Sequence, residues 1–230
     1  ASQTVIDGEV ILDAASGSGW GTNYLARRNS ARLVIGVDWD AGAITEARRH
    51  TPDKARVTFR QGSLLFEQDL AGIRADMIVS FETIEHVSER HSPKLLRNFR
   101  KVSTEEATLV ISTPNRDLYS PYTHREGRPW NIFHKREYDP DEFVDLLETN
   151  YWRVKDLFGQ RFVPKEAYLN LAKLLYVFRH FALRTGLEAH NKLTLFPYIV
   201  LGRVAFLYDP DPSVKPTKDY HNKMPVYLTC

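Results

Sequence analysis

The segment that most constrains the fold of this chain is a glycine-rich turn between a short apolar run and a helical pattern. The apolar run Val10–Ala14 has the character of a buried strand, the turn Ser16–Gly21 follows it, and Thr22–Arg28 begins a helix. Glycines in such a turn let the backbone approach a ligand closely, because no Cβ stands in the way. The segment therefore predicts the first strand and ligand loop of an open α/β sheet, whose ligands bind beyond the carboxyl ends of the strands.

Strand and helix patterns alternate along most of the chain. The predicted strands are Val10–Ala14, Ala31–Val37, Val57–Gln61, Asp76–Phe81, Thr108–Thr113, Trp152–Phe158 and Tyr198–Leu207. The predicted helices include Ala41–His50, a segment in which Leu95, Leu96, Phe99 and Val102 repeat at helical spacing, and Asp139–Thr149; a turn is expected at Ser103–Ala107. Strands that alternate with helices build βαβ units with right-handed crossovers. The sequence therefore predicts an α/β fold, a Rossmann-like, doubly wound and mostly parallel seven-stranded sheet with an antiparallel edge strand and a helix inserted before the last strand.

That inserted helix, Lys165–Leu183, carries two apolar stripes. The first stripe contains Tyr168, Leu171, Leu175, Phe178 and Ala182, and the second contains Leu174, Val177 and Phe181. A helix with two apolar stripes needs two partners. One stripe is expected in the core, and the other is expected to form a lid or a homodimer contact, with a membrane-surface role as a further alternative. The tail after Asp209 carries four prolines and is expected to run extended over the surface.

Charge and cysteine content limit the classes of partner. The formal net charge is +2, with −4 in residues 1–150 and +6 in residues 151–230. This balance predicts no nucleic-acid partner, and the basic last third indicates either an anionic substrate or a solvated face. The single cysteine, Cys230, excludes an intramolecular disulfide and a cysteine-based zinc site. Without a signal peptide or a bilayer-spanning run, we expect a cytoplasmic protein with no stable membrane insertion. The short stretch before the first strand fits a missing N-terminal helix.

A carboxylate, Asp13, stands at the end of the first predicted strand. The glycines Gly17, Gly19 and Gly21 follow it with the spacing G-x-G-x-G. A dinucleotide-binding loop has the spacing G-x-G-x-x-G, because the N-terminus of its helix meets a pyrophosphate. An acid is badly placed beside a pyrophosphate but suits a cationic ligand that carries an amine. S-adenosylmethionine (SAM) carries a sulfonium and an ammonium and no phosphate, so the loop favours SAM over the NAD of an oxidoreductase.

The ends of the next three predicted strands supply further candidate contacts. Asp38 follows the second strand at the distance from the glycine turn where a carboxylate accepts hydrogen bonds from ribose hydroxyls. Trp39 comes next, and its ring is able to lie flat against a purine. Ser63 and Leu64 follow the third strand, where an adenine edge is read, and Phe81 ends the fourth.

Five segments in this order resemble class I SAM-dependent methyltransferases. They are ILDAASGSGWGTNYLA, VIGVDWD, VSFETIEHV, LVISTPNRD and NIFHKREYDPDEF, which together cover about residues 10–160. The chain is most similar to the bacterial branch whose members often act in polysaccharide and natural-product pathways. The resemblance implies that SAM is bound by Asp13, Ala15, Gly17, Gly19, Asp38, Trp39, Ser63, Leu64 and Phe81.

The resemblance also implies which part of the cofactor each residue contacts. The methionine part is assigned to Asp13, Gly17 and Gly19, the ribose to Asp38, the adenine to Trp39, Ser63 and Leu64, and the amino acid end to the backbone of Phe81. Two of the positions that depart from the family pattern are Ala15, in the first small position of the glycine motif, and Ser63, where an acid is common. The first change keeps the backbone path. The second predicts that the adenine amino group is held differently.

Methyl transfer to a hydroxyl needs a group that takes the alcohol proton, and a histidine suits that task. His86, which closes the segment Glu82–His86 after the fourth predicted strand, is the first candidate base, and His134 in Asn131–Tyr138 is the second. The alternative for His86 is that it braces the cofactor pocket or caps the next helix. We expect no metal site, since His86 and His91 do not share a helix face and carboxylates do not cluster around them.

The stretch between the fifth strand and its helix is rich in polar and aromatic residues. It holds Tyr119, Tyr122, His124 and Trp130, which suit a sugar or another polar ring, or form a plain surface loop. We therefore predict methyl transfer to a small polar acceptor, namely a sugar or glycan hydroxyl. The alternatives are N- or O-methylation of a natural-product scaffold and a non-catalytic SAM-binding module. The expected organisation is a SAM-binding core at 1–160, a helical insertion at 161–196, a last core strand at 197–209 and a tail at 210–230.

Overall fold

The protein divides into two compact units, each with its own hydrophobic core. The computed structural model describes residues 9–28, 30–121, 129–184, 215–216 and 223–229. The first unit consists of Ala1–Thr83, Arg90–Ile111 and Leu147–Arg153, and the second consists of Ile84–Glu89, Ser112–Leu146 and Val154–Cys230.

The first unit is built on a sheet with the strand order β3-β2-β1-β4-β5. Its strands are β1 (Val10–Ala14), β2 (Leu33–Asp38), β3 (Val57–Gln61), β4 (Ala75–Phe81) and β5 (Ser103–Pro114). β1 pairs in parallel with β2 and β4, and β2 pairs in parallel with β3. Every residue of β1 is buried, as in a strand covered on both faces, whereas β3 alternates between buried and exposed residues. The predicted α/β fold with a parallel sheet is confirmed for these five strands.

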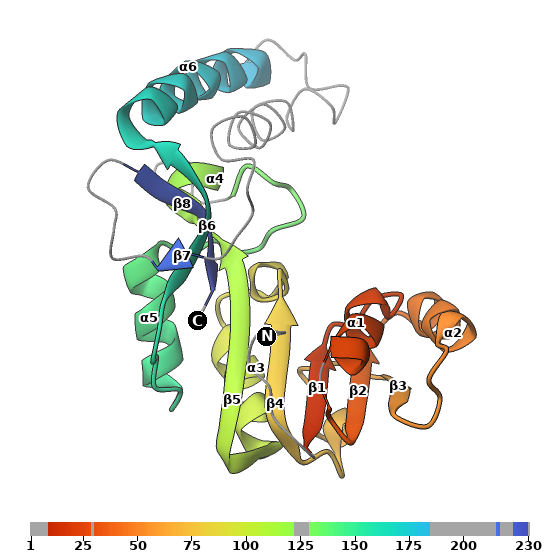
Figure 1. The fold of residues 1–230 in the computed structure, drawn as a ribbon. Coiled ribbons are helices and arrows are strands. Elements are labelled where there is room, and N and C mark those ends of the chain that lie inside the picture. The colour runs from red at the N-terminus through yellow and green to blue at the C-terminus, as the bar shows by residue number, and fades with distance from the viewer. Residues whose placement is uncertain (1–8, 29, 122–128, 185–214, 217–222, 230) are drawn as a thin grey trace. The chain divides into compact units, whose positions relative to one another are not determined.

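The helices of the first unit place their apolar faces in its core. They are α1 (Trp20–Arg28), α2 (Ala41–His50) and α3 (Ser92–Lys101), with a 3₁₀ turn η1 at Glu67–Leu70. In Figure 1, α1 and α2 lie beside β2 and β3, and they contact these strands. Asp40 caps α2, because its carboxylate accepts the N–H of Ala43 at 2.6 Å. The core contains Ile11, Leu25, Ala26, Ala31, Val34, Ile44, Ala47, Val57, Phe59, Met77 and Val79.

The register of the parallel strands brings their carboxyl ends to one edge of the sheet. Ala14 of β1 pairs with Val37 of β2, and Asp38 of β2 pairs with Gln61 of β3. The residues that follow these strands therefore emerge side by side, and this is the edge at which open α/β sheets bind ligands.

Two segments around α3 differ from the sequence-based expectation. The turn expected at Ser103–Ala107 belongs to β5, because Ser103 Oγ donates to Phe99 O at 2.7 Å and α3 passes directly into the strand. The strand expected at Trp152–Phe158 begins only at Phe158. Trp152 is instead anchored on α3, where its Nε1 donates to Leu96 O at 3.1 Å, so its apolar character reflects packing and not a strand.

The second unit combines three antiparallel strand pairs with short and long helices. Its elements are η2 (Ile84–His86), α4 (Arg116–Tyr119), α5 (Pro140–Thr149), β6 (Phe158–Pro164), α6 (Lys165–Arg184), β7 (Lys215–Pro216) and β8 (Lys223–Thr229), with the first part of α5 in this unit. The end of β5 pairs antiparallel with β8, β8 with β6, and β6 with β7. The expected strand at Tyr198–Leu207 lies outside the described residues, so the predicted count of seven strands stays a prediction.

β8 forms within the tail that was expected to run extended over the surface. Its residues Tyr227–Thr229 pair with β5, whereas Pro225 pairs only with β6. A proline lacks the N–H that a strand needs toward a second neighbour, so Pro225 is tolerated where one side of β8 is an edge. Four prolines in the tail therefore did not prevent a strand.

α6 confirms the prediction of a helix with two apolar stripes. On the first stripe, Tyr168 and Leu175 are buried, and they belong to the core of the second unit together with Leu118, Tyr119, Trp130, Val163 and Ala172. On the second stripe, Leu174 is 66% exposed and Val177 is 59% exposed. Tyr168 and Leu175 of the first stripe thus face the core of their unit, and whether the second stripe forms a lid or a dimer contact stays a prediction.

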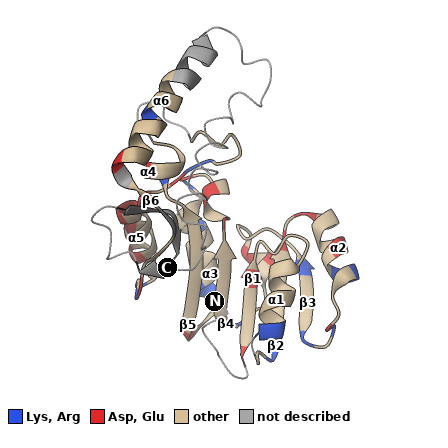
Figure 2. Cartoon of the chain, turned by 45° about the horizontal axis from the view of Figure 1, so that its top comes forward, with Lys and Arg blue, Asp and Glu red and all other residues tan. Residues whose placement is uncertain are grey.

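Charged residues of both signs are interspersed along the described helices and strands (Figure 2). Basic residues gather in the last turns of α1, α2 and α3, where they complement the negative end of the helix dipole. Within the described ranges, no helix combines the length and the apolar character needed to cross a bilayer.

Candidate functional site

The glycine turn after β1 folds back onto the end of β2. The N–H groups of Ala15 and Ser16 both donate to Val37 O, at 2.9 and 3.0 Å. Ala15, Gly17 and Gly19 all have positive φ, at 67°, 52° and 80°. A non-glycine residue such as Ala15 rarely adopts this conformation. The turn thus places closely spaced backbone at the ligand edge of the sheet.

Asp13 is buried under this turn. Its Oδ2 accepts a hydrogen bond from Thr22 Oγ1 at 2.6 Å, and the side chain is almost fully removed from solvent. Burial raises the pKa of Asp13 to about 6; the Thr22 hydrogen bond lowers this pKa, and the nearby Asp38 raises it further. A buried carboxyl with a near-neutral pKa gains strongly from a cationic partner, and the ammonium of an amino acid is such a partner.

Asp38 is held in place by two backbone N–H groups. Its Oδ2 accepts from Gly17 at 2.8 Å, and its Oδ1 accepts from Asp40 at 2.9 Å. Each carboxylate oxygen keeps a second lone pair for a ligand hydroxyl. Trp39 beside it is 76% exposed, so its indole face is open to a planar group. This pair of residues fits a ribose and a purine.

The loop after β3 brings a carboxylate that the sequence reading missed. Ser63 donates its N–H to Asp69 Oδ2 at 2.8 Å, and a Cβ on Gly62 would lie 2.8 Å from the Cβ of Asp69. Leu64 is fixed through its carbonyl, which accepts from Asn98 Nδ2 at 2.9 Å. Asp69 thus approaches the position where Ser63 replaces the usual acid, and only the glycine at 62 allows that approach.

Two buried hydroxyls near the strand ends lack a partner in the described part of the chain. They are Ser16 Oγ in the glycine turn and Ser80 Oγ next to Phe81 at the end of β4. Buried polar groups are almost always hydrogen-bonded, so such atoms indicate a partner that a ligand or water supplies. Phe81 itself is 47% exposed. Together with the two carboxylates and the exposed indole, these atoms form a set of polar and aromatic contacts that fits SAM.

The two histidines predicted as candidate bases lie together in the second unit. Their rings meet edge to face, with centroids 5.0 Å apart at 87°. His86 Nδ1 is 3.0 Å from Phe133 O, and His134 Nδ1 is 2.5 Å from Glu137 Oε1. Because a carbonyl and a carboxylate only accept, both Nδ1 atoms carry the proton. Each ring in its neutral form therefore presents a lone pair at Nε2.

The two rings differ in what their Nε2 atoms contact. His134 is buried, and its Nε2 lies 2.9 Å from Asn131 Nδ2, which donates to it. The side chain of His86 is 47% exposed, and its Nε2 lies 3.9 Å from Glu85 Oε1. His86 is thus better placed to take a proton from a substrate, whereas His134 is held inside a hydrogen-bonded network.

Glu85 and Glu137 complete this cluster, and neither was singled out from the sequence. Glu85 is 1% exposed, its Oε2 accepts from Thr113 Oγ1 at 3.3 Å, and its backbone carbonyl accepts the N–H of Lys135 at 2.7 Å. Glu137 is also buried. The adjacent residues Glu85 and His86, and the three-residue spacing from His134 to Glu137, are signals that point to this pairing.

Ion pairs fasten the segment that carries His134. Arg116 of α4 binds both Asp139 and Glu142, the latter at 2.5 Å, and Arg136 binds Glu142 at 3.1 Å. These pairs tie α4 and the loop to the start of α5. Burial lowers the pKa of Arg116, but the carboxylates of Glu142 and Asp139 outweigh it and leave the pKa raised. These ion pairs therefore stabilise the position of the segment that carries His134.

Neither alternative for Tyr119 and Trp130, a substrate contact or a plain surface loop, agrees with their burial. Trp130 is fully buried and Tyr119 nearly so, and both pack in the core of the second unit. Tyr122 and His124 lie outside the described residues. Among the described residues of this region, Ile132 is 48% exposed and Phe133, whose carbonyl binds His86, is 64% exposed.

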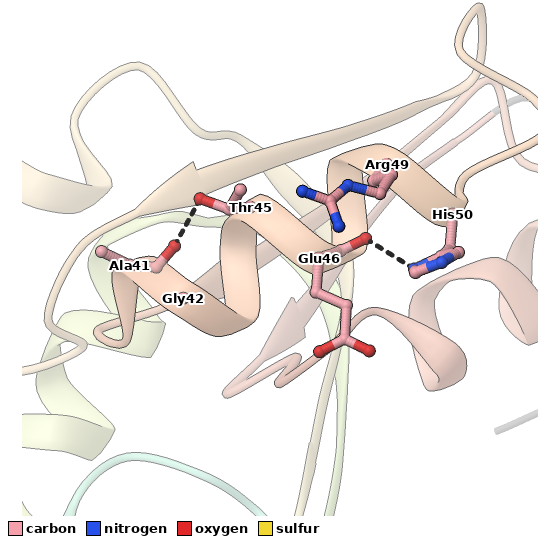
Figure 3. Close-up of a pocket in the computed structure, with 6 residues that line it drawn as sticks. All are labelled: Ala41, Gly42, Thr45, Glu46, Arg49 and His50. Carbon is pink, nitrogen blue, oxygen red and sulfur yellow. Dashed lines mark hydrogen bonds between the residues drawn. The ribbon is translucent and has the colours of Figure 1, made fainter.

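A hollow along α2 contains none of the predicted site residues. It is lined by Ala41, Gly42, Thr45, Glu46, Arg49 and His50 (Figure 3). Thr45 Oγ1 donates to Ala41 O at 2.8 Å, and His50 Nδ1 lies 3.1 Å from Glu46 O, so these polar side chains are bound within their own helix. The hollow is the solvated face of α2.

Comparisons with known proteins agree with the geometry of the first unit. Residues 11–106 match the family model of a methyltransferase domain. The chain is 34% identical over 154 residues to a probable S-adenosylmethionine-dependent methyltransferase of Mycolicibacterium smegmatis, covering 66% of this chain and 55% of the relative. It is 26% identical over 174 residues to the mitochondrial ubiquinone biosynthesis O-methyltransferase of Saccharomyces cerevisiae, covering 69% and 54%. The chain thus spans about half the length of these curated relatives.

A solved structure shows the same fold. The crystal structure of an S-adenosylmethionine-dependent methyltransferase from Mesorhizobium loti superposes with a TM-score of 0.56. The superposition covers 68% of this chain and 79% of that one, at 16% sequence identity. At this identity the likeness concerns the fold, and it supports the Rossmann-like methyltransferase architecture.

Proposed function

Residues 11–106 are a methyltransferase domain with SAM-dependent homologues, and from this premise we propose that the protein transfers the methyl group of SAM to a hydroxyl of a small acceptor. The observation that carries the proposal is the set of polar and aromatic contacts at the ligand edge of the first unit. Asp13 would bind the ammonium, Asp38 the ribose, and Trp39 the adenine face. SAM supplies an activated methyl group on its sulfonium, so the protein must mainly bind, orient and remove a proton.

His86 is the group that we propose as the base. Its Nδ1 proton is bound by Phe133 O, which fixes the ring and leaves Nε2 to accept the proton of the acceptor hydroxyl. Its exposed side chain is reachable by an acceptor.

A sugar or glycan hydroxyl is the first acceptor class to test, and this choice rests on the resemblance to bacterial methyltransferases of polysaccharide pathways. A second class, a scaffold with an apolar or aromatic ring, is favoured by the exposed Ile132 and Phe133 beside His86. One of the relatives is named for an O-methylation in ubiquinone biosynthesis. Assays with nucleotide-linked sugars and with simple phenols, both using labelled SAM, separate the two classes.

Asp38→Ala is expected to weaken SAM binding by about 1–3 kcal/mol, because the ribose hydroxyls and two backbone N–H groups lose a charged acceptor. Isothermal titration calorimetry with SAM and with S-adenosylhomocysteine measures this loss. Asp40→Ala is the matched control, since its carboxylate caps α2 and is not assigned to the cofactor. An Asp38→Ala protein that binds SAM as tightly as the wild type contradicts the assignment of this site.

His86→Ala is expected to lower the rate of methyl transfer and to leave SAM affinity unchanged, because the base acts on the acceptor only. The comparison of the turnover number with the calorimetric affinity checks this expectation. An equal loss in both quantities makes His86 a residue that braces the cofactor pocket. SAM binding without transfer to any acceptor class favours the alternative of a non-catalytic SAM-binding module.

A further inference from the structure

The histidine cluster of the second unit has the composition of a metal site. Glu85, His86 and His134 each offer one ligand atom, and these atoms all lie within 4.8 Å of one another. Two imidazoles and one carboxylate are a ligand set that holds Zn²⁺ and related divalent cations in proteins. We infer that Glu85, His86 and His134 bind one divalent transition-metal cation, of which Zn²⁺ is the representative.

The tautomers of both histidines support this inference independently of the distances between the ligand atoms. Metal-binding histidines usually donate their second ring N–H to a carboxylate or a backbone carbonyl, which orients the ring. His134 does so to Glu137 at 2.5 Å, and His86 does so to Phe133 O at 3.0 Å. Both rings thereby direct their lone pairs away from these acceptors. The donation from Asn131 Nδ2 to His134 Nε2 shows that this nitrogen is an acceptor atom.

Binding of the ion requires a small contraction of the cluster. In a tetrahedral zinc site, bonds of about 2.0–2.2 Å place neighbouring ligand atoms about 3.3 Å apart. His86 Nε2 and Glu85 Oε1 are 3.9 Å apart, and His86 is exposed enough to move toward the buried carboxylate. The ion would take the lone pair of His134 Nε2 that Asn131 now occupies. The buried carboxylate of Glu137 would offset part of the ion's charge.

No metal site was expected from the sequence, where His86 was compared with His91, its neighbour along the chain. The structure pairs His86 instead with His134, which is distant along the chain and carries its own carboxylate partner, Glu137. A contact between residues so far apart in sequence is not visible in local spacing.

A cation held by three protein ligands keeps a coordination position open. With the ion bound, His86 Nε2 is a ligand and no longer accepts a proton, so the ion would replace His86 as the group that promotes deprotonation. On the proposed function, the acceptor hydroxyl would take the open position and release its proton to water more readily, as a metal-bound water does. This role rests on the proposed function, whereas the binding of the cation does not. The acceptor would then be a hydroxyl or phenol and not an amine.

The test measures Zn²⁺ binding by the intact chain after treatment with a chelator. Isothermal titration calorimetry gives the affinity, equilibrium dialysis with elemental analysis gives the stoichiometry, and Co²⁺ provides a visible absorption spectrum that reports nitrogen ligands. We expect one Zn²⁺ per chain and no competition from Mg²⁺, because imidazole ligands favour the transition metals. His50→Ala is the matched control, since His50 is an exposed histidine on α2 outside the cluster.

His86→Ala is expected to abolish this binding, and Glu137→Gln is expected to weaken it by about 10–100-fold, the usual cost of losing an orienting partner. Unchanged SAM affinity in both variants shows that the first unit is folded. A stoichiometry that survives His86→Ala, or a wild-type chain that binds no Zn²⁺, overturns the inference. If Zn²⁺ binds as expected but no acceptor is methylated, the metal site stands and the proposed function fails.

Discussion

Gly19→Ala is expected to lower the free energy of unfolding by about 2–5 kcal/mol, the sum of overpacking and backbone strain. A Cβ at this position would lie 2.5 Å from Phe59 Cζ and 2.8 Å from the Cβ of Ala47. Both neighbours are buried in the core of the first unit, so neither is free to retreat. The φ of 80° adds a conformation that an alanine rarely adopts.

Two other glycines separate the steric cost from the backbone cost. Gly17 and Gly72 also have positive φ, at 52° and 76°, but no atom lies within 4 Å of a Cβ added to either. Their alanine variants should lose only about 1–2 kcal/mol, the strain alone. Urea unfolding of the three variants measures the differences. If Gly19→Ala and Gly72→Ala lower the free energy of unfolding equally, contacts with Phe59 and Ala47 do not prevent a side chain at position 19.

The turn that contains Gly19 also illustrates why the fold of the first unit could be predicted from the sequence. The glycine turn, Asp38 and the buried strands are local patterns, because each strand of a parallel sheet and the loop after it are contiguous in the chain. Apolar runs predicted β1, β2 and β4, and an alternating pattern predicted β3, each within two residues at either end. The register then places the predicted cofactor residues at one edge of the sheet without further information.

The parts that the sequence did not reveal depend on contacts between distant residues. Asp69 reaches Ser63 because a 3₁₀ turn folds back over Gly62. No sequence pattern between these two residues indicates that contact. Trp152 was predicted to lie in a strand, and Trp130 was considered as a substrate contact or a surface-loop residue. Both side chains are instead buried and pack against their own unit. Aromatic residues carry the same letter in either role, so only the packing separates them.

The pH dependence of SAM binding should report the ionisation of Asp13. Burial raises its pKa from 3.8 to about 6, so between these pH values the folded chain keeps a proton that the unfolded chain has released. The stability of the ligand-free protein therefore falls as the pH rises through this window, by about 3 kcal/mol once the pH exceeds the folded pKa. The ionised carboxylate remains destabilising until a cation pairs with it.

The ammonium of SAM is the proposed cation, and it binds the ionised form of Asp13. Binding should therefore release a proton below the folded pKa, and the affinity for SAM should fall about tenfold between pH 7 and pH 5. Calorimetry in buffers of different ionisation enthalpy measures both the affinity and the proton release. The unfolding free energy of the ligand-free protein, followed over the same pH range, should change in the opposite direction.

Two variants determine whether Asp13 is the titrating group. Asp13→Asn keeps an oxygen for Thr22 Oγ1 but cannot ionise, so it should bind SAM weakly at pH 7, with a flat profile, and should be more stable than the wild type when ligand-free. Thr22→Val removes the hydrogen bond that lowers the pKa of Asp13, so the midpoint of the binding profile should move to higher pH. If Asp13→Asn shows the same pH profile of SAM binding as the wild type, another group titrates and Asp13 does not bind the ammonium. A midpoint that moves with Thr22→Val, in contrast, ties the affinity for the cofactor to this one buried carboxyl.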